Sequence, residues 1–311
     1  MSQHFFYCSE LSRQATERVY ATASIGGLWL LLEYAQGWEP RAFQESHLSP
    51  AVKTFLSTVP RARLLLIKRD RKRQERLSFF VVRSRESDPF IVKFELDDYE
   101  QLLNIDIASA AAGRPSAGGV VSKSPLFLVC THGKRDKCCA KFGYPLYKSL
   151  REYGDDAAAA VWQSSHVGGD RFAANLICFP HGLFYAHVNE EAGHKILREY
   201  AAERRRLVLE KYRGRTCYSY PVQAAEYFIR SESKITGLDG LRHLTHERLD
   251  ENAWRVRFLA TDTERVYEAR VTGVFSEFHN YITCHSTEKR RVIQYLLDDY
   301  QVVDDRLLVS A

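Results

Sequence analysis

The fold is indicated first by the stretch LFLVCTHGKRDKCCAKFGYPLYKSL, residues 126–150. Its apolar run 126–129 has the length and composition of a buried strand that ends at Cys130. A polar loop follows as far as Cys139. Residues 145–153 then read as a helix with a proline in its first turn. A strand, a polar loop and a helix in this order favour an α/β fold.

The residues after this stretch continue the same alternation. A second strand candidate, 157–162, leads to His166. Two more, 175–179 and 183–188, flank a Pro-His-Gly turn and predict a hairpin. A final helix is expected after Asn189, whose side chain can cap it. This order of elements is close to that of thioredoxin.

We therefore expect an α/β protein with a thioredoxin-like domain at residues 125–203. Residues 108–124 are small, Gly-rich and aperiodic, and they are the best linker candidate. Before them, residues 1–107 are expected to form an N-terminal α/β region, with strands at 64–67 and 79–82.

Residues 204–311 are expected to form a C-terminal α+β extension. Its helix is expected near 224–230, and its strand candidates are 254–259, 265–271 and 281–284.

Composition and charge exclude several classes of protein. The chain has 311 residues, 45% of them hydrophobic and 27% charged, as in soluble globular proteins. A net charge of +5 is too weak to indicate a nucleic-acid partner. No apolar run approaches the roughly 18 residues of a membrane span, and the start MSQHFFYCSE does not resemble a secretory signal. We expect a cytoplasmic protein without a membrane or nucleic-acid partner. Its seven cysteines should then be thiols, metal ligands or redox groups rather than disulfides.

A dense basic stretch at residues 68–76 has two interpretations. It is either a solvated hairpin tip or a docking patch for an acidic redox partner.

The main chemical signal is the loop from Cys130 to Cys139. Thiolates are the soft donors that iron–sulfur clusters and zinc select. Lys134, Arg135 and Lys137 should favour the thiolate form. The alternative is a packed Cys130 in the core with an unrelated cysteine pair at the surface.

A second signal is His166, which precedes two glycines. A lone loop histidine is more often a hydrogen-bonding residue than a ligand. Here the strand before it should lie parallel to the strand that ends at Cys130. Both loops would then open at the carboxyl edge of the sheet, where α/β proteins bind ligands. This convergence favours ligation.

The two motifs CTHGKRDKCCA (130–140) and SHVGGDRFAANLICFPHGLFYAHV (165–188) resemble the sucrase/ferredoxin-like family of thioredoxin-like ferredoxins. The similarity extends over most of the chain. It includes Ser12-Arg13, residues 27–33, Trp38, residues 64–68, 213–217 and 223–226.

This resemblance implies a 2Fe–2S cluster bound by two cysteines and two histidines. The family positions correspond to Cys130, Cys139 and His166, while Asp170 stands where the second histidine is expected. Asp170 either ligates the cluster, with a lower reduction potential, or pairs with an arginine. Cys138 could take the place of Cys139 as a ligand. The fourth bond could also come from His132, His181 or Cys178. The arginines that Asp170 could pair with are Arg171 and Arg135.

The function expected from this site is one-electron transfer to a redox partner protein, rather than an enzymatic activity of its own. A zinc site with the same donors is one alternative. A thiol–disulfide oxidoreductase is disfavoured because the Cys-x-x-Cys spacing is absent. A binding module that has lost its cluster is the third.

Overall fold

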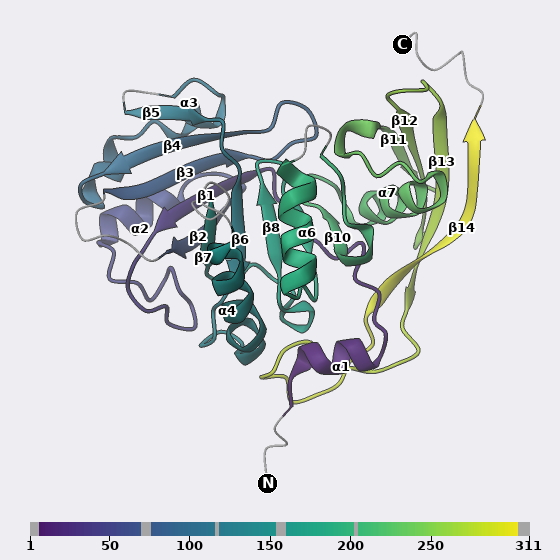
Figure 1. Ribbon diagram of the computed structural model, residues 1–311, viewed down its shortest axis with the longest axis horizontal. Coiled ribbons are helices and arrows are strands. Elements are labelled where there is room, and N and C mark those ends of the chain that lie inside the picture. Colours follow the sequence, from purple (N-terminus) through teal and green to yellow (C-terminus); the bar gives the residue numbers. More distant parts are fainter. Residues whose placement is uncertain (1–5, 70–75, 116–117, 154–159, 202–204, 304–311) are drawn as a thin grey trace.

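The computed structural model describes residues 6–69, 76–115, 118–153, 160–201 and 205–303. These form two sheets (Figure 1): a mixed sheet of ten strands in the order β10-β9-β8-β6-β7-β2-β1-β3-β4-β5, and an antiparallel sheet in the order β11-β12-β13-β14.

The large sheet combines strands from the N-terminal half and from the centre of the chain. Its strands are β1 (Leu28–Glu33), β2 (Ala62–Lys68), β3 (Leu77–Arg83), β4 (Phe90–Leu96), β5 (Gly119–Ser122), β6 (Leu126–Cys130), β7 (Val161–Ser164), β8 (Leu176–Phe179), β9 (Leu183–Tyr185) and β10 (Tyr212–Arg215).

The small sheet and the helices complete the structure. The remaining strands are β11 (Leu241–Arg248), β12 (Ala253–Ala260), β13 (Val266–Phe275) and β14 (Ile293–Val303). The α-helices are α1 (Cys8–Gln14), α2 (Pro50–Ser57), α3 (Ile107–Ala111), α4 (Lys137–Glu152), α6 (Glu190–Ala201) and α7 (Tyr220–Ser233), and the 3₁₀ helices are η1 (Glu100–Asn104), η2 (Asp170–Phe172), η3 (Leu209–Lys211) and η4 (Leu238–Gly240).

Strand β6 lies in the interior of the large sheet and is buried on both faces. Side chains alternate along a strand. Phe127 and Val129 therefore enter a core shared with α4 and α6, while Leu128 and Cys130 enter the core on the other face. This double burial explains why the strand is apolar throughout.

The sequence predicted the parallel neighbourhood of β6 and β7, and the structure confirms it. Cys130 pairs with Ser164, so the loops after both strands leave the same edge of the sheet. The predicted hairpin is also present as β8 and β9. Asn189 caps the helix that follows, because its side chain accepts a hydrogen bond from the amide of Ala192.

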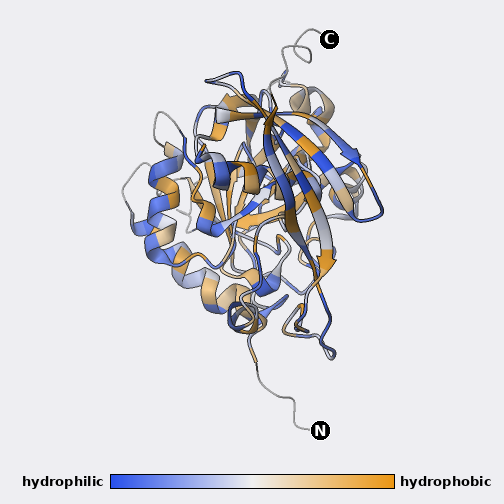
Figure 2. Cartoon of the chain, turned by 90° about the vertical axis from the view of Figure 1, so that its right-hand side faces the viewer, coloured by the Kyte–Doolittle hydropathy of each residue, from blue (hydrophilic) through white to orange (hydrophobic). Residues whose placement is uncertain are grey.

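The four-stranded sheet packs against α7 through one apolar face. Figure 2 shows hydrophobic and hydrophilic residues alternating along its strands. This fits a sheet with one covered and one solvated face. The predicted helix at 224–230 lies inside α7, and the predicted strands at 254–259 and 265–271 correspond to β12 and β13.

Helix α4 begins eight residues earlier than the sequence predicted. The side chain of Asp136 accepts a hydrogen bond from the amide of Cys138 and caps the helix at Lys137. Pro145 therefore stands inside α4 and not in its first turn. The prediction failed because proline was taken as the start signal and the capping aspartate was overlooked.

Two further segments differ from expectation. The predicted linker 108–124 contains most of α3 as well as β5, which pairs with β4 as an edge strand. The strand predicted at 281–284 is wrong, because these residues lie in the loop between β13 and β14. Strand candidate 157–162 and basic stretch 68–76 fall partly on residues that are not described. The division into separate domains stays a prediction.

Candidate metal centre

Cys130 is the last residue of β6 and is 1% exposed. Its amide donates to the carbonyl oxygen of Asn175 at 3.2 Å, which holds the strand end against the loop after His166. The thiol lies on the face of the sheet that also carries Trp162 and Val167. The residue after the strand, Thr131, donates its amide to Ser164 and keeps the two strand ends in register.

Cys139 stands in the first turn of α4 and is fully buried. The helix approaches β6 so closely that a Cβ at Gly143 would overlap the carbonyl oxygen of Cys130. Glycine is therefore required at this position for the two thiols to face each other. This contact brings Cys139 into the same core cluster as Cys130.

His166 follows β7, and a neighbouring histidine positions it. Nδ1 of His132 accepts the backbone amide of His166 at 3.2 Å, while Nε2 of His132 lies 2.9 Å from the carbonyl oxygen of Glu39. Both ring nitrogens of His132 are thus occupied. The sequence also offered His132 for the fourth bond to the cluster. The structure does not favour this role, because His132 positions the loop that carries His166 instead.

The structure brings three of the four predicted site residues together. The two sulfur atoms of Cys130 and Cys139 and a ring nitrogen of His166 all lie within 4.8 Å of one another. These donors come from a strand end, a helix start and a loop that share one edge of the sheet. Such a set of soft and borderline donors fits zinc or an iron–sulfur centre.

Asp170, the fourth predicted residue, borders this group. Its Oδ1 lies 2.9 Å from Nδ1 of His166 and 3.7 Å from Sγ of Cys139. The two glycines before it adopt left-handed φ angles, 93° at Gly168 and 82° at Gly169, which turn the chain so that Asp170 points inward. Asp170 is 4% exposed.

The alternative in which Asp170 pairs with an arginine is not observed. Arg171 forms its ion pair with Glu17 at 2.6 Å. Among the described residues, neither Arg171 nor Arg135 makes an ion pair with Asp170. The carboxylate therefore remains directed at His166 and Cys139.

One buried nitrogen in this group lacks a well-oriented partner. Among the described residues, none meets this nitrogen, Nδ1 of His166, with hydrogen-bond geometry, although Oδ1 of Asp170 lies 2.9 Å away. Buried polar atoms are usually satisfied, and the carboxylate of Asp170 is the group that approaches this nitrogen. A metal atom is a suitable partner for an imidazole nitrogen.

The two thiols and the imidazole of this group shift one another's pKa values. Its contacts with Cys139 and His166 hold the pKa of Cys130 well below its usual range. The same contact with Cys130, together with burial, raises the pKa of Cys139. Burial opposes the charged form of His166, but Asp170 and Cys130 raise its pKa to about 9. The site is therefore prepared to hold thiolate, the form that binds metal.

One side of the group reaches the surface. The side chain of His166 is 23% exposed, whereas the two thiols are buried. A pocket of about 350 Å³ lies beside it, with Arg41, Arg135 and His132 among its lining residues. The site is thus covered on the cysteine side and accessible on the histidine side.

The remaining sequence alternatives lie elsewhere. Cys178 points into the core on the opposite face of the sheet, with α4 and α6. His181 follows the end of β8 that pairs with Leu126, away from the Cys130 end. Cys138 faces Cys8 and not Cys130.

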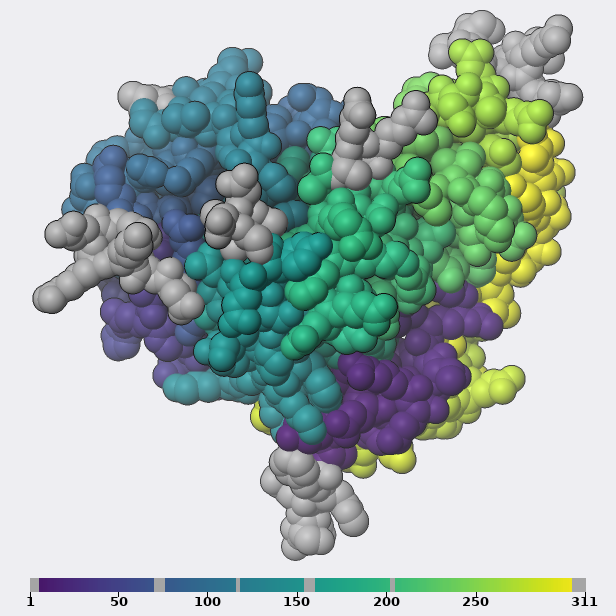
Figure 3. Space-filling model, in the orientation of Figure 1, coloured from purple at the N-terminus to yellow at the C-terminus, as the bar shows by residue number. Residues whose placement is uncertain are grey.

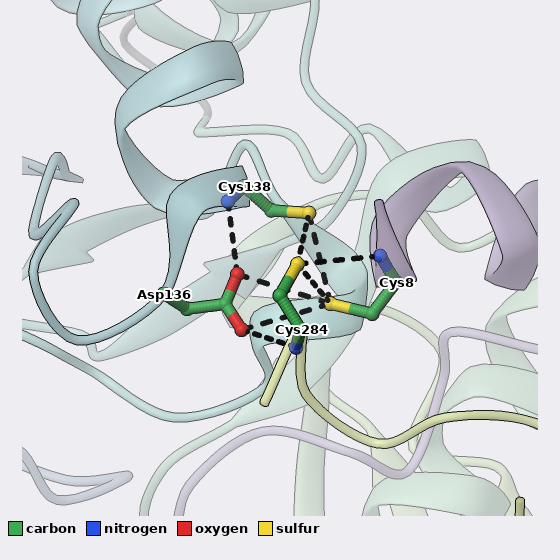
Figure 4. A group of neighbouring side chains, drawn as sticks. All are labelled: Cys8, Asp136, Cys138 and Cys284. Atoms are coloured by element: carbon green, nitrogen blue, oxygen red, sulfur yellow. Dashed lines mark hydrogen bonds between the residues drawn. The ribbon is translucent and has the colours of Figure 1, made fainter. Parts of the chain in front are cut away.

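Cys138 belongs to a second group that sequence reasoning did not find. Figure 4 shows Cys8, Asp136, Cys138 and Cys284 directed at one another. Cys8 and Cys284 are separated by 276 positions. The only signal in the sequence is an odd number of cysteines, which carries no pairing information.

The fold and this geometry define a mixed α/β protein with a cysteine–histidine group suited to a metal centre. A family model described as sucrase/ferredoxin-like matches residues 19–214, more than half of the chain. The chain belongs to the sucrase/ferredoxin-like family. The matched region includes Cys130, Cys139, His166 and Asp170, and it excludes Cys8 and Cys284.

No curated protein and no solved structure matches the chain. Within the described residues, every helix is too short or too polar to cross a bilayer.

Proposed function

We propose that this protein transfers single electrons through a 2Fe–2S cluster held by Cys130, Cys139, His166 and Asp170. The observation that carries the proposal is the convergence of two buried sulfurs and one imidazole nitrogen within 4.8 Å, with the carboxylate of Asp170 beside them. A thioredoxin-like character of residues 125–203 and a cytoplasmic location belong to the same proposal. When bound, the cluster would supply a one-electron couple.

The residues around the site have distinct roles in this proposal. Cys130 and Cys139 offer soft thiolate donors from rigid elements, a strand end and a helix start. Their burial excludes water. Asp170 adds an anionic oxygen donor, which favours the oxidised state and lowers the reduction potential relative to a second histidine.

The exposed edge of His166 is the natural route for electrons. Arg41 and Arg135, both exposed, border the same pocket; Glu45 pairs with Arg41 at 3.3 Å, and Arg135 adds positive charge to this face. An acidic partner protein would be steered to it by complementary charge. We therefore place the docking face for a redox partner over His166.

The test is anaerobic purification followed by iron and acid-labile sulfide analysis and a visible spectrum. We expect about two iron and two sulfide per chain and a brown colour. The variant Cys139→Ala should lose both. The matched control is Cys178→Ala, another fully buried thiol outside the site, and it should keep both. Colourless protein without sulfide, holding a zinc ion that Cys139→Ala loses and Cys178→Ala keeps, would show the zinc alternative instead.

A further inference from the structure

We propose that Cys8, Asp136, Cys138 and Cys284 form a second metal site that binds one zinc ion. This site is separate from the group at Cys130. Its ligand atoms lie within 4.8 Å of one another, and it joins three distant parts of the chain. It does not depend on the proposed electron-transfer function.

The distances within the group fit a single tetrahedral ion. The three sulfur–sulfur separations are 3.6 Å for Cys8–Cys138, 3.3 Å for Cys138–Cys284 and 3.6 Å for Cys8–Cys284. Sγ of Cys8 lies 3.9 Å from both carboxylate oxygens of Asp136. A zinc ion with bonds of about 2.3 Å to sulfur needs sulfur–sulfur edges of about 3.8 Å. A small outward movement of the thiols accommodates it.

The polypeptide supplies the environment that zinc thiolates need. The amide of Ser9 donates to Sγ of Cys138, and the amide of Cys8 donates to Sγ of Cys284, each at 3.5 Å. Hydrogen bonds to sulfur stabilise the deprotonated ligand and orient it. Cys8 and Cys138 are fully buried, and Cys284 is partly exposed, which leaves an entry path for the ion.

Asp136 is positioned as the fourth ligand by the backbone. Its Oδ1 accepts the amide of Cys138 at 2.8 Å, and its Oδ2 accepts the amide of Cys284 at 2.7 Å. The carboxylate therefore cannot rotate away from the three sulfurs. Each oxygen retains a lone pair, and a carboxylate oxygen is an accepted zinc donor.

The place of the group in the molecule indicates a structural role. Cys8 begins α1, Cys138 stands in the first turn of α4, and Cys284 lies in the loop between β13 and β14. Figure 3 shows the N-terminal segment against both α4 and the loop between β13 and β14 at this end of the molecule. Zinc would fasten α1 and the loop between β13 and β14 to α4, the helix that carries Cys139. On binding, the ion displaces the thiol protons, which pass to water.

The experiment uses the full chain with Cys130→Ala and Cys139→Ala, so that the first group cannot contribute thiolates. Purified under reducing conditions, this background should retain one zinc per chain and no acid-labile sulfide. Replacement of zinc by Co²⁺ should give the absorption of a tetrahedral thiolate site.

Adding Cys284→Ser should weaken zinc binding by more than about 100-fold, since loss of an outer-shell partner alone costs 10- to 100-fold. Asp136→Asn keeps an oxygen for the helix cap and should also weaken binding. Circular dichroism shows whether each variant is folded. Cys217→Ser, a thiol outside both groups, is the matched control and should bind zinc normally.

The opposing results are equally definite. The site is refuted if the folded double variant Cys130→Ala, Cys139→Ala binds no zinc. A disulfide among Cys8, Cys138 and Cys284 in the reduced preparation would also refute it, and so would acid-labile sulfide in this variant. Unchanged zinc affinity in Cys284→Ser would also refute it. Conversely, Cys284→Ser in the otherwise native chain should keep the iron and sulfide assigned to the first site, so the two proposals fail separately.

Discussion

The carboxylate of Asp170 stands where the resemblance implied a second histidine, and it approaches the imidazole of His166 to 2.9 Å. It faces Cys139 as well, and no arginine among the described residues pairs with it. A buried carboxylate without a cation is costly unless another group compensates its charge. The negative charge of Asp170 is therefore compensated only if a metal centre or a charged His166 lies beside it.

Two variants of this residue separate ligation from simple proximity. Asp170→Ala should lose iron to a chelator about 10-fold faster and should change the visible spectrum, because a donor is removed. Asp170→His should raise the reduction potential, on the order of 100 mV, because a neutral ligand replaces an anionic one. Spectra and iron content equal to those of the native protein in Asp170→Ala would remove Asp170 from the ligand set.

His181 determines part of the pH dependence of stability. Burial, followed by the charges of Arg215 and Arg205, lowers its pKa to about 3. In the unfolded chain the pKa is about 6.5, so the unfolded state binds the proton first as pH falls. This contribution to stability is complete above about pH 6.5 and declines toward pH 3. At pH 5 the free energy of unfolding should be lower by about 2 kcal/mol because of His181.

Urea unfolding at pH 7 and pH 5 tests this expectation. His181→Gln should lose less stability between these pH values than the native protein does. Some dependence should remain, because burial also lowers the pKa of His187 to about 3. The exposed His47 offers a control, and His47→Gln should follow the native curve. An identical pH dependence in His181→Gln and native protein would contradict the argument.

At the scale of elements, the contact between α4 and β6 decides whether the two thiols meet. Gly143 lets the helix backbone reach the carbonyl of Cys130. Gly143→Ala would improve helix propensity by about 1 kcal/mol. The overlap with backbone atoms should outweigh this gain, for a net destabilisation of about 1–3 kcal/mol. It should also separate Cys139 from Cys130 and reduce iron binding.

Denaturant unfolding and iron analysis of Gly143→Ala measure both effects. Gly37→Ala is the control, since a Cβ there meets nothing within 4 Å. That variant should keep native iron content. Full iron content in a stable Gly143→Ala protein would show that the close approach of α4 is not needed for the site.

At the scale of the whole molecule, Arg213 joins segments from three regions. It is buried in β10 and donates to the carbonyl and hydroxyl oxygens of Thr22, to the carbonyl of Gly168 and to the side chain of Asn175. The N-terminal segment, the loop before Asp170 and β10 are thus held by one guanidinium. Its removal would leave several buried acceptors without a donor.

We expect Arg213→Met to destabilise the protein by about 3 kcal/mol and to lower iron retention, because the turn at Gly168 loses its anchor. Arg215→Met is the matched control. Arg215 is equally buried on the same strand but donates to Glu86 instead. This control should be destabilised while its iron content is preserved. Equal iron loss in both variants would assign the effect to general instability.

Prediction from sequence succeeded where short-range patterns apply. The apolar run of β6, the hairpin of β8 and β9 and the Asn189 cap were all readable, because each depends on neighbouring residues. The meeting of Cys130 and His166 at one edge also followed, since parallel strands end on the same side. It failed at the start of α4, where the capping Asp136 was overlooked in favour of Pro145, and at residues 281–284, which lie in a long loop.

The sequence by itself determined the first cysteine–histidine group, because its residues lie on adjacent elements whose direction can be inferred. The second group was decided only by the tertiary structure. Cys8 and Cys284 stand near opposite ends of the chain, and no periodicity or spacing relates them. They become neighbours because α1 and the loop before β14 both pack against the first turn of α4. Such a contact depends on how whole elements fill space, and local sequence carries no record of it.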